Sequence, residues 1–309
     1  MNALVGYTGF VGSNLYKKGQ FDHIYNSKNI TDSYGSKPDL LIYAGMRAEK
    51  YLANHAPDKD MLLVEQATEN IVKIAPKKLI LISTIDVFKS PLDVDEETPI
   101  DCTELQPYGY NRYQLECRIR EYFPDALIIR LPGLFGINIK KNFIYDFINI
   151  IPFMLNHEKF EELSKKEPDL HSFYVLQDNG FFKCRDLFGD EKRILQKKFQ
   201  SLGFTALNFT DSRSIYQFYP LARLWDDIQI ALDNSILLWH PATEPVSASE
   251  IYQYLTGNPF INELHGIPAN YDYKTKYAKL FGGRDKYICQ KDEIMQIMAK
   301  FINEQKKLL

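Results

Sequence analysis

The sequence predicts an α/β fold in which helices wind over both faces of a parallel sheet, joined to a smaller helix-rich region. Apolar runs of strand length alternate with segments of helical apolar spacing through the first half of the chain. The runs Asp39–Gly45 and Lys78–Thr84 have continuous apolar centres, as expected for strands buried on both faces. Strands that alternate with helices in this way form parallel, doubly wound sheets.

Each predicted element of the first half has a local signal. Asn2–Gly6 is a short apolar run that ends in glycine, and Pro57 stands where a helix with apolar periodicity begins. The predicted strands are Asn2–Gly6, His23–Lys28, Asp39–Gly45, Lys78–Thr84 and Asp125–Gly133, and the predicted helices are Phe10–Lys18, Pro57–Ala75 and Tyr108–Phe123.

The alternation of strands and helices ends after about Lys140. Residues 145–214 are charged, aromatic and helix-rich, and the tail 291–309 has the spacing of an amphipathic helix. A helix at Leu221–Leu232 and a strand at Ser235–Pro241 suggest that the chain returns to the sheet. We therefore expect a nucleotide-binding domain over residues 1–145 with a returning segment at about 216–237. Residues 146–215 and 238–309 would form a substrate-binding region.

Composition and charge exclude several functional classes. The 309 residues are 45% hydrophobic and 25% charged with a net charge of −3, so neither nucleic acid nor a membrane surface is an expected partner. The four cysteines show no CxxC spacing and the six histidines no HExxH motif, which predicts reduced thiols and no metal site. No signal peptide is visible, and the longest apolar run, Phe147–Leu155, is far shorter than the ~20 residues that span a bilayer. A cytoplasmic protein is expected.

Glycines mark the first junction between a strand and a helix. Gly6, Gly9 and Gly12 form a GxxGxxG pattern there. Glycines at such a junction allow a tight turn and the close approach of a diphosphate to the free N–H groups of the helix. A tight turn without a ligand is the alternative, but the position in a parallel α/β chain favours binding.

The end of the second strand carries no acidic residue. Folds that bind NAD usually place Asp or Glu there to hold the ribose 2′-hydroxyl, whereas this chain has Asn26-Ser27-Lys28. A serine and a lysine suit a 2′-phosphate, which mildly favours NADP. Plain loop residues are the alternative interpretation.

Two later elements, a strand and the helix after it, carry hydroxyl groups and a cation. Ser83 and Thr84 end a buried strand, at the edge where ligands bind in such sheets. Tyr108 and Arg112 share one face of the following helix. A tyrosine has a pKa near ~10, so a nearby cation would help it to exchange protons at neutral pH. The alternatives are a strand-end cap and an exposed aromatic ring stacked on an arginine.

Together these motifs resemble the extended short-chain dehydrogenase/reductase family, the group of NAD-dependent epimerases and dehydratases. The resemblance rests on "GYTGFVG", "STIDVF", "PYGYNRYQLE" and "RLPGLFG", in that order, and is strong up to about Gly136. It implies a Rossmann-type fold, an NAD(P) cofactor and a nucleotide-sugar substrate, and it suggests a homodimer.

The resemblance also implies individual roles. Tyr108 would be the general acid–base and Thr84 would hydrogen-bond the same substrate oxygen. Arg112 stands where the family has lysine, which binds the nicotinamide ribose. Asp86 and Asn142 would contact the substrate. The implied cofactor-binding residues are Gly6, Thr8, Gly9, Phe10, Val11, Gly12, Asn26, Ser27, Lys28, Ala44, Gly45, Ser83, Pro132 and Leu134.

Departures from the family pattern reduce the number of reactions that the resemblance leaves open. Ile85 follows Thr84 where sugar dehydratases carry an acidic residue that assists the loss of water, so a dehydratase is less expected. The short connection between Tyr25 and Asp39 looks like that of the dehydrorhamnose reductases, which lack one strand there. We therefore expect hydride transfer at the sugar C4, by a 4-keto reductase or by an epimerase.

Two further functions stay open. Arginine in place of lysine at position 112 keeps the charge but changes the shape, which would also suit a redox-silent NAD(P) sensor or scaffold. A doubly wound domain that binds some other phosphate ligand is the remaining alternative.

Overall fold

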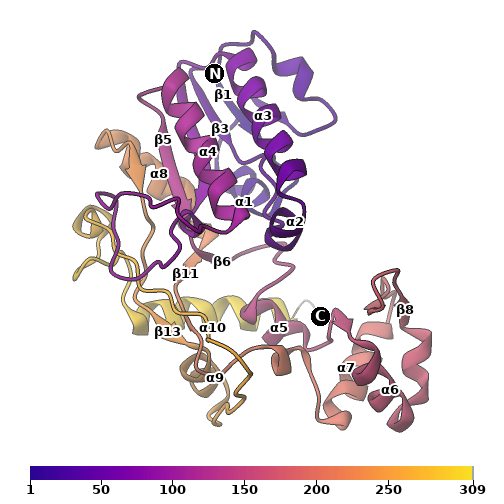
Figure 1. Ribbon diagram of the computed structural model, residues 1–309. Coiled ribbons are helices and arrows are strands. Elements are labelled where there is room, and N and C mark those ends of the chain that lie inside the picture. Colours follow the sequence, from indigo (N-terminus) through magenta and orange to yellow (C-terminus); the bar gives the residue numbers. More distant parts are fainter. Residues whose placement is uncertain (308–309) are drawn as a thin grey trace. The chain divides into compact units, whose positions relative to one another are not determined.

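The computed structural model describes residues 1–307. The chain forms two compact units (Figure 1). The first contains Met1–Ile139, Ile215–Val246 and Ala269–Met298. The second contains Lys140–Ser214, Ser247–Pro268 and the residues from Ala299 onward.

The returning part of the first unit is longer than the expected 216–237. Residues 269–298, which the sequence analysis assigns to the second region, belong to the first unit. The physical reason is a small apolar core in which Tyr273, fully buried, packs with Ile85 and Val87. Residues 269–290 show no helical or alternating pattern, so the return of this stretch to the first unit has no local signal.

A parallel sheet of six strands forms the centre of the first unit, and it confirms the predicted fold class. The strand order is β12-β5-β4-β3-β1-β2, and every neighbouring pair is parallel. All five strands predicted in the first half are present, and β12, one of the two edge strands, comes from the predicted 235–241 run. The strands are β1 Asn2–Val5, β2 His23–Tyr25, β3 Leu40–Tyr43, β4 Lys78–Thr84, β5 Leu127–Leu131 and β12 Leu238–Trp239.

The connection between β2 and β3 contains a short 3-10 helix, Ile30–Ser33. The strand β2 forms the edge of the sheet opposite β12. Within the described chain no further strand lies beyond β2 in this sheet. The short connection between β2 and β3 therefore adds no strand to the sheet, as the sequence predicts.

Two long helices cover one face of this sheet. The helices α3, Pro57–Ile74, and α4, Pro107–Tyr122, lie side by side (Figure 1). Their buried residues, including Ile71 and Ile119, pack against alternate strand residues such as Val5. The helix α1, Phe10–Lys18, packs beside α8, Leu224–Asp233. A short helix that the sequence analysis did not predict, α2, covers Lys50–His55.

The second unit combines helices with a small antiparallel sheet of three strands in the order β7-β9-β8. Its core includes Leu155, Phe160, Leu195 and Phe199. The sequence analysis expected helices here and missed the sheet, because strands of two or three residues are too short to show alternation. The elements are α5 Phe143–Asn149, β7 Met154–Leu155, α6 His157–Lys166, β8 Tyr174–Leu176, β9 Phe182–Cys184, α7 Glu191–Leu202 and α9 Ala248–Thr256.

Apart from several more short 3-10 helices, the remaining elements are two short strand pairs and the closing helix. The strands β6, Gly133–Phe135, and β11, Phe218–Pro220, pair in parallel, and β10, Ile215–Tyr216, pairs with β13, Val246–Ser247. The helix α10 covers Lys291–Lys307; the last two residues of the predicted tail helix lie outside the described residues. None of the helices within residues 1–307 combines the length and the apolar character that a bilayer span requires.

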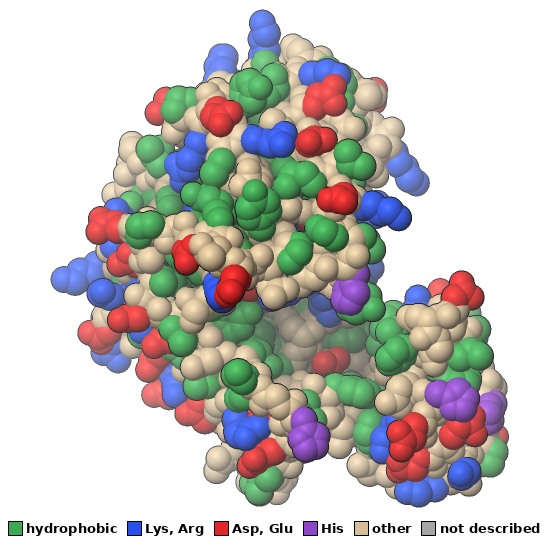
Figure 2. All heavy atoms as spheres, in the orientation of Figure 1, with side chains coloured by type: hydrophobic (Ala, Val, Ile, Leu, Met, Phe, Trp, Pro, Cys, Tyr) green, Lys and Arg blue, Asp and Glu red, His purple; other side chains and the backbone are tan. Residues whose placement is uncertain are grey.

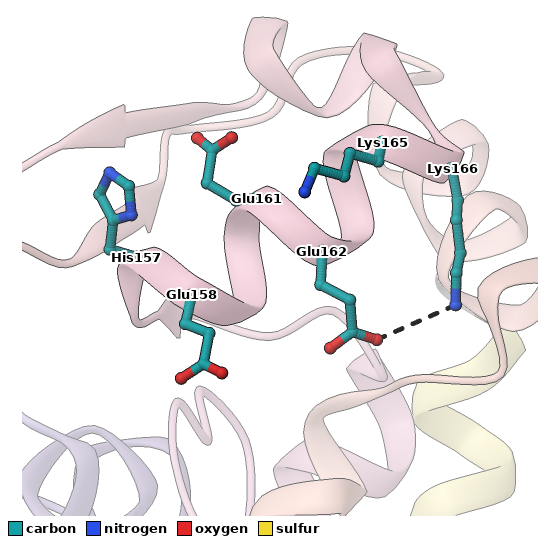
Figure 3. A pocket seen from close by; sticks show the side chains of 6 residues that line it. All are labelled: His157, Glu158, Glu161, Glu162, Lys165 and Lys166. Atoms are coloured by element: carbon teal, nitrogen blue, oxygen red, sulfur yellow. Dashed lines mark ion pairs between the residues drawn. The ribbon is translucent and has the colours of Figure 1, made fainter.

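The helix α6 presents a charged surface. A hollow of about 580 Å³ lies over it, lined by His157, Glu158, Glu161, Glu162, Lys165 and Lys166. Figure 3 shows that all of these side chains project from this one helix, with Lys166 paired to Glu162 at 3.9 Å. Because no second element lines the hollow, it is a solvated helix face rather than a binding site.

Candidate functional site

The glycine turn after β1 is closed by backbone contacts that leave no room for side chains. Gly6 has φ +90°, and a Cβ there would lie 2.4 Å from the carbonyl oxygen of Ala44. A Cβ on Gly12 would lie 2.1 Å from the carbonyl oxygen of Gly6. No side chain caps the start of α1, so its first N–H groups have no side-chain acceptor and could hold a diphosphate. The residues present therefore fit a dinucleotide.

The ends of β2 and β3 flank this cradle. Tyr25 and Tyr43, the last residues of these strands, both lie beside Val5 of β1. Asn26-Ser27-Lys28 and Ala44-Gly45 follow directly, so both predicted segments lie at the same edge as the glycine turn. Asn26 Oδ1 accepts the N–H of Lys28 at 2.8 Å, which fixes the loop and leaves Ser27 and Lys28 exposed.

Thr84 and Tyr108 meet at the carboxyl edge of the sheet. Thr84 ends β4, and its hydroxyl oxygen accepts the N–H of Asp86 at 3.2 Å. Tyr108 lies in the first turn of α4 and is only 7% exposed. A Cβ on Gly109 would lie 2.0 Å from the carbonyl oxygen of Asp86, so glycine is required where α4 presses on this turn. The sequence analysis quoted Gly109 within its motif but gave it no role.

The surroundings of Tyr108 keep its phenol protonated. Burial raises the pKa of Tyr108 above its ordinary value, and this outweighs the opposing effect of the Arg112 charge. The carboxylate of Asp86 raises the pKa further, whereas a hydrogen bond with Thr84 lowers it. The phenol is therefore in its neutral, protonated form at neutral pH.

Arg112 lies against Tyr108, but its hydrogen bonds go elsewhere. The guanidinium carbon is 4.6 Å from the centre of the Tyr108 ring. Its two terminal nitrogens donate to Asp60 of α3 at 2.8 and 3.0 Å, and one of them also donates to the carbonyl oxygen of Arg47 at 2.7 Å. The side chain is 4% exposed. Arg112 thus forms a buried, bidentate ion pair that offsets its charge and occupies most of its donors.

Asp86 has two partners that the sequence analysis did not identify. Lys50 Nζ of α2 donates to Asp86 Oδ2 at 3.1 Å, and the hydroxyl of Tyr271 donates to Asp86 Oδ1 at 3.0 Å. Burial, followed by the charge of Asp86, raises the pKa of Tyr271. Neither partner stands in a motif, and only the folded chain brings them together.

Ser83 belongs to a different network from Thr84, because successive strand residues point to opposite faces. Its hydroxyl donates to Glu116 at 2.5 Å, and Glu116 forms a buried ion pair with Arg130 at 2.7 Å. Burial and the neighbouring Arg130 lower the pKa of His240 to about 3, so this ring is neutral. The Ser83 hydroxyl is therefore engaged inside the protein, as are Glu116 and Arg130 of the motifs.

Of the other predicted residues, Thr8 lies in the glycine turn and Phe10 and Val11 begin α1, and the rest lie near strand ends or in the second unit. Pro132 follows β5, and Leu134 lies in β6, which pairs with β11. Asn142 is in the second unit, where its side-chain oxygen accepts the N–H groups of Ile144 and Tyr145 and caps α5. Within residues 1–307 no cluster of His, Cys, Asp or Glu side chains is arranged to hold a metal ion.

Comparison with known proteins identifies structural similarity at low sequence identity. No family model matches the sequence, and no curated protein matches it. The dTDP-4-dehydrorhamnose reductase of Yersinia enterocolitica is 15% identical with a TM-score of 0.63, over 99% of each chain. RMD of Pseudomonas aeruginosa, complexed with NADPH, is 12% identical with a TM-score of 0.65, over 100% of this chain and 99% of that chain.

An epimerase has a similar structure too. The UDP-glucuronic acid 4-epimerase of Bacillus cereus, in complex with NAD and a UDP-sugar analogue, is 15% identical with a TM-score of 0.60, over 100% of each chain. The similarity to these three structures extends over both units. The chain therefore has the fold of the extended short-chain dehydrogenase/reductase family.

Proposed function

We propose that the protein is an NAD(P)-dependent oxidoreductase that reduces the 4-keto group of a nucleotide-activated sugar, with NADP(H) as the preferred cofactor. The observation that carries this proposal is the Thr84–Tyr108 pair beside the glycine cradle, with a phenol that stays protonated. The similar structures include a dTDP-4-dehydrorhamnose reductase and a complex with NADPH, which supports a reductase that uses NADP(H).

Separate residues of the chain would bind the cofactor, transfer the proton and bind the sugar. The glycine turn and the start of α1 would hold the diphosphate, and Ser27 and Lys28 would hold the 2′-phosphate. A bound reduced nicotinamide would supply the hydride to C4. Tyr108 donates its proton to the C4 oxygen as the carbonyl becomes an alcohol, and solvent then returns a proton to the phenolate. The Thr84 hydroxyl donates a hydrogen bond to the same oxygen, and Asp86 accepts from a sugar hydroxyl.

Reduction is favoured over epimerisation by the electrostatics around Tyr108. An epimerase must first remove a proton from the C4 hydroxyl, which requires a phenolate. Here Asp60 offsets the charge of Arg112, while burial and Asp86 favour the neutral phenol. The surroundings therefore favour the protonated phenol with which a reduction begins. An epimerase is the second candidate, because a similar structure belongs to one.

Replacement of Tyr108 by phenylalanine tests this proposal. The purified protein would be incubated with NADPH and a nucleotide-linked 4-keto-6-deoxy sugar, and the loss of NADPH absorbance followed. We expect Tyr108→Phe to lower kcat by roughly 10²–10⁴-fold, because general acid catalysis is lost. Cofactor affinity, measured by calorimetry, should be unchanged, and Tyr110→Phe, on the exposed side of α4, should behave as wild type.

Two outcomes would contradict the proposal in different ways. If neither NADPH nor NADH binds, the cradle holds some other phosphate ligand. If the cofactor binds but no sugar nucleotide is turned over, the redox-silent sensor is the better description.

We also propose that the protein forms a homodimer through α3 and α4. Both helices carry apolar side chains on their outer surfaces, and Figure 2 shows hydrophobic groups gathered among charged ones over these helices. Several exposed apolar side chains on one pair of helices are a feature of interaction sites. The exposed residues are Leu62, Leu63, Val72, Tyr110 and Tyr122.

A further inference from the structure

The helix that carries Tyr108 does not cap its own N-terminus. Gln106, at the N-cap position of α4, makes no side-chain cap bond, and Pro107 has no N–H. The N–H of Tyr108 is therefore the first donor of the helix that needs a partner. It donates to the side-chain oxygen of Asn54 at 2.9 Å. The cap thus comes from the end of α2, 54 residues earlier in the sequence.

Two residues that precede Asn54 in the chain also contact the candidate site. Lys50 donates to Asp86, and the carbonyl oxygen of Arg47 accepts from Arg112. We refer to residues 47–56 as the anchoring segment. Each of these bonds ends on a residue of the candidate site.

A buried ion pair secures the chain just beyond the anchoring segment. Asp60 is 7% exposed and receives both terminal nitrogens of Arg112. Asn111 donates to Asp60 at 3.0 Å and to the carbonyl oxygen of Pro57 at 3.0 Å. The first turn of α3 is therefore fixed against the turn of α4 that follows Tyr108. This arrangement fixes the direction in which the anchoring segment approaches Tyr108.

We propose that Asn54 is a positioning residue that sets the phenol of Tyr108 against Thr84 by capping α4 in place of a local residue. The inference rests on the proposed function for its catalytic consequence, but the cap itself is a matter of structure alone. Without the cap the first turn of α4 frays, and Tyr108 lies in that turn. The hydroxyl groups of Tyr108 and Thr84 are then less often placed to contact the C4 oxygen of the substrate together.

The test compares Asn54→Ala, which removes the acceptor, with Asn54→Asp, which keeps one and suits a helix N-terminus. Lys59→Ala, an exposed change in α3, is the matched control. Protein labelled with ¹⁵N-tyrosine gives the exchange rate of the Tyr108 amide, with Tyr108→Phe to assign its signal. We expect the alanine variant to exchange roughly fivefold faster or more, and the aspartate variant and the control to match wild type.

Kinetics with NADPH and the 4-keto sugar nucleotide separate positioning from general stability. Asn54→Ala should lower kcat by about tenfold with the KM for NADPH unchanged, and Asn54→Asp should restore kcat. An unchanged amide exchange rate in Asn54→Ala overturns the proposal, as does equal loss of kcat in both variants. If wild type has no reductase activity, the proposed function fails while the exchange measurement still decides whether Asn54 caps Tyr108.

Discussion

At the scale of single residues, Arg112 shows what an arginine does at a position where the resemblance implies a lysine. A lysine presents one compact ammonium, whereas the arginine fork matches a carboxylate with two parallel bonds. Asp60 supplies that carboxylate, so the fork faces α3 and the carbonyl oxygen of Arg47. Arg112 therefore acts on Tyr108 through the face of its ring and a partly offset charge. This geometry supports a structural contribution of Arg112 as well as an electrostatic one.

The buried pair itself gives a prediction about stability. Arg112→Met alone leaves Asp60 buried without its cation and should lower the free energy of unfolding by roughly 3–5 kcal/mol. The double variant Asp60→Leu with Arg112→Met removes both charges and should lie within about 1–2 kcal/mol of wild type. Urea unfolding measures both.

An exposed pair on α3 is the control for this comparison. Lys73→Ala breaks the ion pair with Glu69, whose side chains are about half exposed, and should change stability by less than ~1 kcal/mol. If the single Arg112 variant is no less stable than the double variant, the ion pair does not hold α3 and α4 as described.

At the scale of elements, the glycine turn gives a graded prediction. A Cβ on Gly12 would lie 2.1 Å from a backbone oxygen, whereas a Cβ on Gly9 would lie 3.3 Å from the same oxygen of Gly6. Backbone cannot yield by rotating a side chain, so Gly12→Ala must displace the turn or the helix. We expect Gly12→Ala to weaken NADPH binding by at least about tenfold and Gly9→Ala to weaken it less, as measured by calorimetry. The reverse order would show that the steric contact does not shape the cradle.

The elements also show how far local patterns predict a fold. The helix at Phe10–Lys18 and the strand at Lys78–Thr84 form with the predicted bounds. The helix begins directly after Gly9, and the strand is a continuous apolar run of strand length. The helix α2 was missed because its six residues hold one buried side chain, Ala53, which is too little for a period to appear. Short strands of the second unit were missed for the same reason.

At the scale of the whole molecule, the proposed homodimer gives a measurable outcome. Leu62 is 63% exposed and lies on α3, so Leu62→Glu would place a charge in the proposed interface and should convert a dimer into a monomer. Light scattering coupled to gel filtration reports the mass. Leu280→Glu is the control, since Leu280 is also exposed but belongs to the short helix Ala278–Phe281. A monomeric wild type, or a dimer that survives Leu62→Glu, contradicts the proposal.

Local patterns in the sequence by themselves determine the doubly wound sheet, the glycine turn and the order of Thr84, Tyr108 and Arg112. These features are encoded within a few neighbouring residues, through apolar period, glycine conformation and helical spacing. The contacts around the candidate site join residues far apart in the chain: Asn54 with Tyr108, Asp60 with Arg112, and Tyr271 with Asp86. No local period connects such partners, and only the packing of α2, α3 and the returning segment around α4 brings them together. Tertiary structure therefore decided that Tyr108 is buried and capped and that Arg112 is paired, because burial and ion pairing depend on what the rest of the chain places around each group.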